Sequence, residues 1–207
     1  NLLKGGTLPD VASVINFGSG DDPAEQFESF AKFRTGVPKM VGEYWVGWFD
    51  HWGEKHHTVT VETVKRGVET FRQNEISFNL YMFHGGTTFG YMAGANYSRR
   101  SPYEPDISAY DYDSPLDEAG RVTPKYTAIR EVIKKYLPEG ETIPEVPETT
   151  RMIAIPPFEL TETANIDSLL KKPVKSAMPL PMEDLKQNYG FVLYRRKIES
   201  DANGKLQ

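Results

Sequence analysis

The chain has 207 residues, a formal net charge of −5 and no cysteine. Its length lies between one and two average domains. Its 39% of hydrophobic residues rises to about 47% with the 17 glycines, which is ordinary for a globular chain with a core. The acidic balance without a long basic run argues against a nucleic-acid partner, and no apolar run is long enough to indicate a membrane span. The absence of cysteine excludes a disulfide framework, a thiol nucleophile and a thiolate metal site.

The first half of the chain alternates apolar runs with amphipathic segments, which predicts βαβ units and a parallel sheet. The β-branched run from 11 to 17 predicts a first strand, and it ends at a cluster of turn residues. After this cluster Phe27, Phe30 and Phe33 recur at every third residue. This spacing predicts a helix whose aromatic face packs on the sheet.

A second strand is predicted from 39 to 49, running into an unusually aromatic loop. A helix with one apolar face is predicted from Val61 to Phe71, because apolar residues follow at spacings of three and four. A third strand is predicted from 76 to 83, where glycines stop it. The expected order is therefore strand, helix, strand, helix, strand.

Residues 90–120 have little periodicity and predict a long irregular loop of the kind that carries function. A last helix is predicted to begin at Thr123, as the cap, with Pro124 in the first turn. We place a first domain at 1–138 and a proline-rich linker at 139–172.

The remaining segment, 173–207, is predicted to begin an all-β domain. Residues 189–198 have the pattern of a strand, and Asn203–Gly204 is a strong hairpin signal. No partner strand follows this turn and the chain does not begin with Met, so we expect a fragment of a longer protein.

Glu43 is the strongest candidate for chemistry. It lies near the carboxyl end of the second predicted strand, the end at which parallel α/β folds carry catalytic groups. Large aromatic residues surround it in the sequence, and aromatic faces stack on sugar rings. A carboxylate suits sugar chemistry because positive charge develops at the anomeric carbon in the transition state.

Three further observations concern whole motifs. The segments 42–53 (GEYWVGWFDHWG), 79–89 (NLYMFHGGTTF) and 110–120 (YDYDSPLDEAG) occur in this order along the chain. Together they resemble the β-galactosidases of glycoside hydrolase family 35, and 189–195 (YGFVLYR) is similar to the start of that family's β-region after the barrel. The resemblance covers essentially the whole chain.

The resemblance implies the C-terminal part of a TIM barrel, strands 6 to 8 with their helices, from a retaining exo-glycosidase that removes terminal β-galactose. Glu43 matches the nucleophile. Tyr81, Tyr110 and Tyr112 match tyrosines of the galactose pocket, and Trp45 stands where relatives often carry Tyr, which favours a stacking or indole N–H role. We assign a supporting role to four further residues: Trp48, Asp50, His51 and Trp52.

The resemblance also implies what the chain lacks. The family's acid/base is a Glu after Asn at the end of strand 4, which precedes this chain, so we expect the isolated chain to be inactive. Asn74–Glu75 has the same two residues but lies before a strand, on the opposite rim, and we reject it. The resemblance implies no metal or cofactor, a β-galactoside oligosaccharide or glycoconjugate as substrate, and a periplasmic, secreted or lysosome-like compartment. The partner chain would be the N-terminal part of the barrel or a second copy.

Two alternatives remain. The chain could be a non-catalytic carbohydrate-binding or interaction module, or a related exo-glycosidase with another preference, such as β-glucosaminides. A metal cluster of His51, His56 and His57 with the nearby acids is a weaker reading, because no pattern of helical ligand pairs is present.

Overall fold

The computed structural model describes residues 2–99, 101, 103–149 and 151–197. The chain divides into two compact units, Asn1–Arg151 and Met152–Gln207. The division falls inside the segment 139–172 that the sequence predicts as a linker. Each unit is described by itself.

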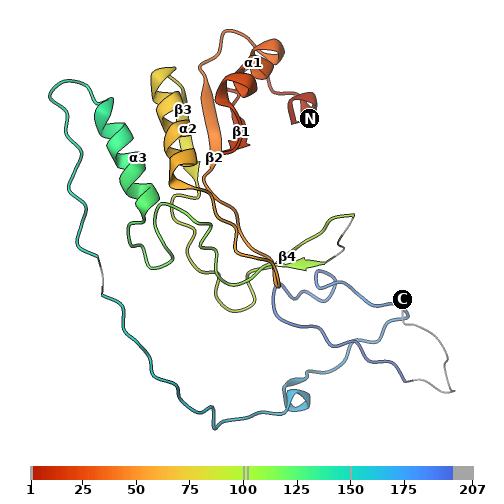
Figure 1. The fold of residues 1–207 in the computed structure, drawn as a ribbon. Coiled ribbons are helices and arrows are strands. Elements are labelled where there is room, and N and C mark those ends of the chain that lie inside the picture. Colours follow the sequence, from red (N-terminus) through yellow and green to blue (C-terminus); the bar gives the residue numbers. More distant parts are fainter. Residues whose placement is uncertain (1, 100, 102, 150, 198–207) are drawn as a thin grey trace. The chain divides into compact units, whose positions relative to one another are not determined.

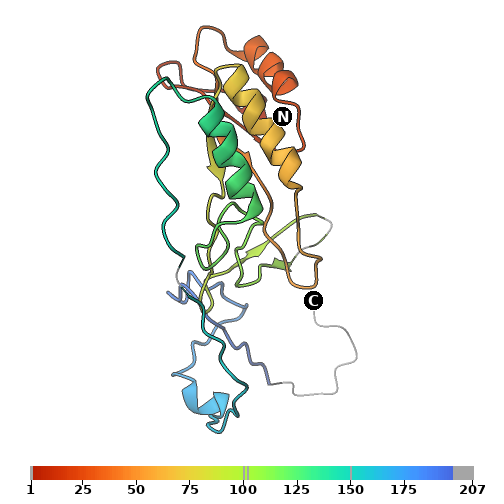
Figure 2. The ribbon, with the colours of Figure 1, turned by 60° about the vertical axis from the view of Figure 1, so that its left-hand side comes forward.

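The first unit is built on three parallel strands in the order β1 (Ile15–Gly18), β2 (Met40–Trp45) and β3 (Ser77–Tyr81). Helix α1 (Pro23–Phe33) connects β1 to β2, and α2 (Val61–Gln73) connects β2 to β3. The predicted order and the α/β class are confirmed. Figures 1 and 2 show that the helices lie side by side over one face of the sheet.

The helices begin where local sequence favours it. Asp22 and Thr60 cap α1 and α2, because their side-chain oxygens accept backbone N–H groups of the first turn. Helix α3 (Pro124–Lys135) begins with proline as predicted, but the cap residue Thr123 makes no side-chain capping bond. Its hydroxyl donates instead to the carbonyl oxygen of Pro115 at 2.9 Å, which ties α3 to the preceding loop. No helix in the described part of the chain is long and apolar enough to cross a membrane.

The core lies between the sheet and the helices. Phe33 was expected in the aromatic stripe of α1, but it is 39% exposed because it is the last residue of the helix, beyond the buried Phe27 and Phe30. The core consists of Phe17, Phe27, Phe30, Val41, Tyr44, Val46, Val64, Val68, Phe71, Ile76, Ile129 and Val132.

The strands are shorter than the apolar runs. The run from 11 to 17 enters the sheet only at Ile15, the first residue paired with β2, and Val11 and Val14 are exposed. A short 3₁₀ helix, η1 (Leu2–Gly5), precedes it. The long loop 90–120 also contains an unexpected two-stranded antiparallel ribbon of β4 (Ala95–Asn96) and β5 (Glu104–Pro105).

The second unit has little regular structure. A 3₁₀ helix, η2 (Ile166–Leu169), is the only helix or strand among its described residues. The strand expected at 189–198 is therefore wrong for 189–197, because an extended segment becomes a strand only when another segment pairs with its backbone. Ile198 and Asn203–Gly204 lie outside the described residues, and the assignment of 173–207 to a β-domain stays a prediction.

Candidate active site

Glu43 lies at the carboxyl half of β2, beside a β-bulge. Its carboxylate oxygen Oε2 accepts a hydrogen bond of 2.9 Å from the indole Nε1–H of Trp45, and both side chains are half-buried. The rejected candidate Glu75 precedes β3. Because β2 and β3 run parallel, Glu75 lies at the amino ends of the strands, whereas Glu43 lies toward their carboxyl ends.

An aromatic cluster forms around this carboxyl end. The ring centroids of Trp45 and Trp48 are 5.5 Å apart, and those of Trp48 and Tyr112 are 6.0 Å apart. Tyr112 also lies 5.6 Å from Tyr81 and 5.5 Å from Tyr110. The structure thus brings together all four tyrosine and tryptophan residues expected to bind substrate, although they come from three separate segments.

The hydroxyls of Tyr110 and Tyr112 are weaker acids than a free tyrosine. Burial raises the pKa of Tyr110, and the nearby Tyr81 hydroxyl and the Glu43 carboxylate add to the rise. Burial likewise raises the pKa of Tyr112, with smaller contributions from the two other tyrosines and from Glu43. Both phenols therefore keep their protons at neutral pH and can donate hydrogen bonds.

Two glycines allow the loop 110–113, called the tyrosine loop below, to lie close against the segments that follow β2 and β3. A Cβ atom at Gly47 would lie 1.8 Å from the carbonyl oxygen of Tyr112, and one at Gly85 would lie 1.7 Å from that of Tyr110. Any side chain at either position would push the loop away. The sequence contains both glycines within its motifs, but their role follows only from the contact.

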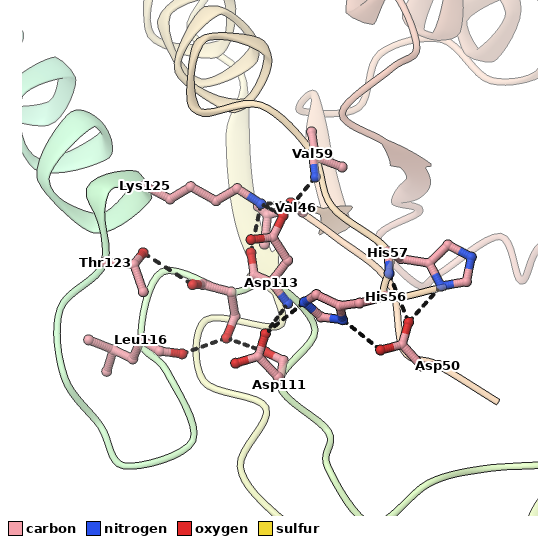
Figure 3. Close-up of polar contacts among 11 residues, drawn as sticks. Val46, Asp50, His56, His57, Val59, Asp111, Asp113, Leu116, Thr123 and Lys125 are labelled. Carbon is pink, nitrogen blue, oxygen red and sulfur yellow. Dashed lines mark hydrogen bonds and ion pairs between the residues drawn. The ribbon is translucent and has the colours of Figure 1, made fainter. Parts of the chain in front are cut away.

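Lys125 holds the same loop at Asp113 (Figure 3). This side chain is buried, and its ammonium donates to the carbonyl oxygen of Val46 at 2.8 Å and to the backbone and carboxylate of Asp113. Tyr112 and Asp113 have positive φ angles of 63° and 50°, a region that non-glycine residues rarely adopt. Burial lowers the pKa of Lys125, and the hydrogen bond to Asp113 opposes this effect. Sequence reasoning missed Lys125, because a lysine in the first turn of a helix gives no signal of burial.

A carboxylate–histidine network extends this support (Figure 3). Buried Asp50 accepts from His56 Nδ1 at 2.6 Å and from the backbone and ring of His57 at 2.9 and 2.8 Å. His56 Nε2 also lies 3.5 Å from Asp111 Oδ1. The hydrogen bond to Asp50 raises the pKa of His56, with Asp111 and Asp113 adding to the rise. For Asp50, bonds from both histidines outweigh the effect of burial and lower its pKa.

The other residues expected to support the site divide into two groups. The His51 ring packs edge-on against Phe49 at 5.4 Å and lies 2.9 Å from Glu54, so it belongs to the cluster's edge. Trp52 is 73% exposed and donates its backbone N–H to Pro105, so the structure does not bring its ring into the cluster. Among the described residues, no group of three or more His, Cys, Asp or Glu side chains is arranged to hold a metal ion.

Known proteins resemble this chain over its whole length. Residues 1–136 match the family described as "Glycosyl hydrolases family 35". The chain is 40% identical over 208 residues to a β-galactosidase of Xanthomonas manihotis, covering 100% of this chain and 34% of that protein. It is 40% identical to the β-galactosidase of Mus musculus and 39% identical to that of Homo sapiens, in each case over 98% of this chain and 31% and 30% of the relative.

The chain thus spans about a third of the length of these curated relatives. The family match covers β1 to β3 and the three helices, including Glu43 and the aromatic cluster around it. The chain belongs to glycosyl hydrolase family 35.

Proposed function

We propose that this chain supplies the nucleophile and the galactose-binding tyrosines of a retaining exo-β-galactosidase. In this proposal β1, β2 and β3 are strands 6, 7 and 8 of a (β/α)8 barrel. The observation that carries it is the position of Glu43 at the carboxyl end of β2, held by the indole of Trp45 and adjoining the protonated phenols of Tyr110 and Tyr112. The names of the relatives support galactosides as the substrate class.

The reaction follows from this geometry in two steps. A carboxylate oxygen of Glu43 attacks the anomeric carbon and forms an ester while the bond from that carbon to the aglycone oxygen breaks. An acid/base group gives its proton to the departing oxygen. It then takes a proton from water, which attacks the anomeric carbon and breaks its bond to the Glu43 oxygen, so that galactose and the free Glu43 carboxylate are released.

The acid/base group is proposed to lie outside this chain. A retaining enzyme holds its two carboxyl groups only about 5 to 5.5 Å apart. The acids nearest in the sequence to the candidate site have other partners: Asp50 binds His56 and His57, and Asp113 binds Lys125. We therefore expect the isolated chain to show no turnover of aryl β-galactosides.

The aromatic cluster suits the role of a sugar pocket. Tyr81 and Tyr110 place their hydroxyl oxygens 3.5 Å apart, so these two donors converge on one region. The buried ring of Tyr112 contacts the rings of both residues, at centroid distances of 5.6 Å from Tyr81 and 5.5 Å from Tyr110, and so limits the shape of the space. Phenol hydroxyls can donate to sugar hydroxyls or to Glu43, while their ring faces exclude water from the reacting carbon.

Covalent trapping tests the proposal. The enzyme in which this chain is joined to the rest of its barrel is treated with a 2-deoxy-2-fluoro-β-galactoside that has an activated leaving group, and the labelled peptide is sequenced by mass spectrometry. The label is expected on Glu43. Glu43→Gly is expected to remain unlabelled and, with azide, to form an α-galactosyl azide, because azide enters from the face that the nucleophile left.

Glu62→Gln is the matched control, since the Glu62 side chain is 75% exposed on α2. This variant is expected to be labelled and to turn over like the wild type. A label on another residue contradicts the nucleophile assignment. Galactose binding without any label or turnover favours the non-catalytic module, and faster labelling by another fluorosugar favours a different sugar preference.

A further inference from the structure

The strand that carries Glu43 has an irregularity directly at this residue. Ile15 of β1 pairs with Val41, but the next residue, Asn16, pairs with Glu43, so Gly42 is an extra residue. Toward β3 the same irregularity leaves Gly42 and Glu43 opposite the single residue Asn79. A bulge of this kind interrupts ladder pairing and turns the side chain next to it.

Two asparagine side chains bind the backbone of the bulge from opposite sides. The N–H of Glu43 donates to Asn16 Oδ1 at 3.0 Å, and Asn79 Nδ2 donates to the carbonyl oxygen of Gly42 at 3.2 Å. The polarity of both bonds is fixed, because a backbone N–H only donates and a carbonyl only accepts. Asn16 must therefore present its oxygen and Asn79 its nitrogen.

Gly42 is needed for this arrangement. A Cβ atom there would lie 2.6 Å from Val14 Cγ2 and 2.9 Å from Asn16 Oδ1. A side chain would displace Asn16 from the N–H of Glu43. The glycine before the glutamate thus leaves the space in which the asparagine reaches the backbone.

We infer that Asn16 and Asn79 are positioning residues that lock this bulge and so fix the direction in which Glu43 projects toward the anomeric carbon. The inference rests on the proposed role of Glu43 as nucleophile. The two asparagines hold the main chain at Glu43, while Trp45 holds the carboxylate end, so the side chain is fixed at both ends. A misplacement of the nucleophile by about 1 Å can slow attack by about 100-fold.

Paired aspartate variants test this inference in the complete enzyme that contains the chain. Asn16→Asp keeps an acceptor oxygen for the N–H of Glu43, whereas Asn79→Asp loses the donor and turns a carboxylate toward the Gly42 carbonyl. Each variant adds one negative charge beside the bulge, so each is the charge control for the other. The measured quantities are the rate constant of trapping by the fluorogalactoside and the inhibition constant of free galactose.

We expect trapping to slow by about 10- to 100-fold in Asn79→Asp and by less than about 3-fold in Asn16→Asp. The inhibition constant of galactose is expected to stay unchanged in both variants, since the tyrosines that bind the sugar are untouched.

Asn16→Leu and Asn79→Leu, which remove the oxygen and the nitrogen respectively, are both expected to slow trapping as Asn79→Asp does. If these apolar variants do not fold, the aspartate pair still decides the question, because it keeps the size and polarity of asparagine. Equal trapping rates in Asn16→Asp and Asn79→Asp overturn the inference, whether both are fast or both slow. Failure of the proposed function gives a different result, namely a wild-type enzyme whose label is not on Glu43.

Discussion

The buried ammonium of Lys125 gives the sharpest test of how the tyrosine loop is held. Lys125→Met keeps most of the side-chain volume but removes the charge and the bonds to Val46 and Asp113. Removing one partner of a buried ion pair costs about 3 to 5 kcal/mol, because the other charge stays buried without its partner. The Asp113 side chain is 26% exposed and also accepts the N–H of Val59, so we expect the lower end, about 3 kcal/mol.

Urea unfolding followed by tryptophan fluorescence measures this change, since all three tryptophans lie in the first unit. With a denaturant slope of about 2 kcal/mol per molar, the midpoint of Lys125→Met should fall by about 1.5 M. Lys32→Met is the control, because Lys32 also pairs with a carboxylate but its side chain is 73% exposed. Its midpoint should not change measurably.

A double variant separates the ion pair from other effects of the substitution. Adding Asp113→Asn to Lys125→Met removes the unpaired carboxylate, so part of the lost stability should return. A midpoint for Lys125→Met that falls no further than that of Lys32→Met would refute the reasoning. A double variant whose loss of stability exceeds the sum of the losses in the two single variants would also refute it.

Two other predictions concern the same loop. Gly47→Ala should lower the free energy of unfolding by about 2 kcal/mol, because its Cβ would meet the Tyr112 carbonyl. Gly20→Ala is the control and should have little effect, because the space around Gly20 is open. The urea midpoints of the two variants are compared, and equal shifts would contradict the close contact at Gly47. The pKa of His56 is raised above its unfolded value by Asp50, so its contribution to stability is complete below the unfolded pKa of about 6.5 and is lost as the pH rises through the folded pKa. Urea midpoints at about pH 5.5 and about pH 8.5 should therefore differ more for the wild type than for His56→Gln, and an equal difference would show that His56 is not the source.

The sequence by itself determined the three parallel strands and the three α-helices of the first unit, and the strongest candidate for chemistry. Spacings of three and four residues locate α2, and the apolar run before the glycines of 85–86 locates β3, because these patterns are local. Glu43 was identifiable for the same reason: a carboxylate that follows a buried run lies at the carboxyl end of a parallel strand. The local pattern failed at 189–197, where strand formation depends on a partner that periodicity does not encode.

Only the tertiary structure decided how the site is held. Lys125 reaches the carbonyl of Val46 across 79 residues, and Asn16 reaches the backbone of Glu43 across 27. Such bonds depend on which distant segments the fold brings together and on the one-residue bulge at Gly42. Neither produces a periodic pattern in the sequence. A helix or strand is fixed by neighbours within a few residues, whereas the direction of a catalytic side chain is fixed by whatever the fold places around its backbone.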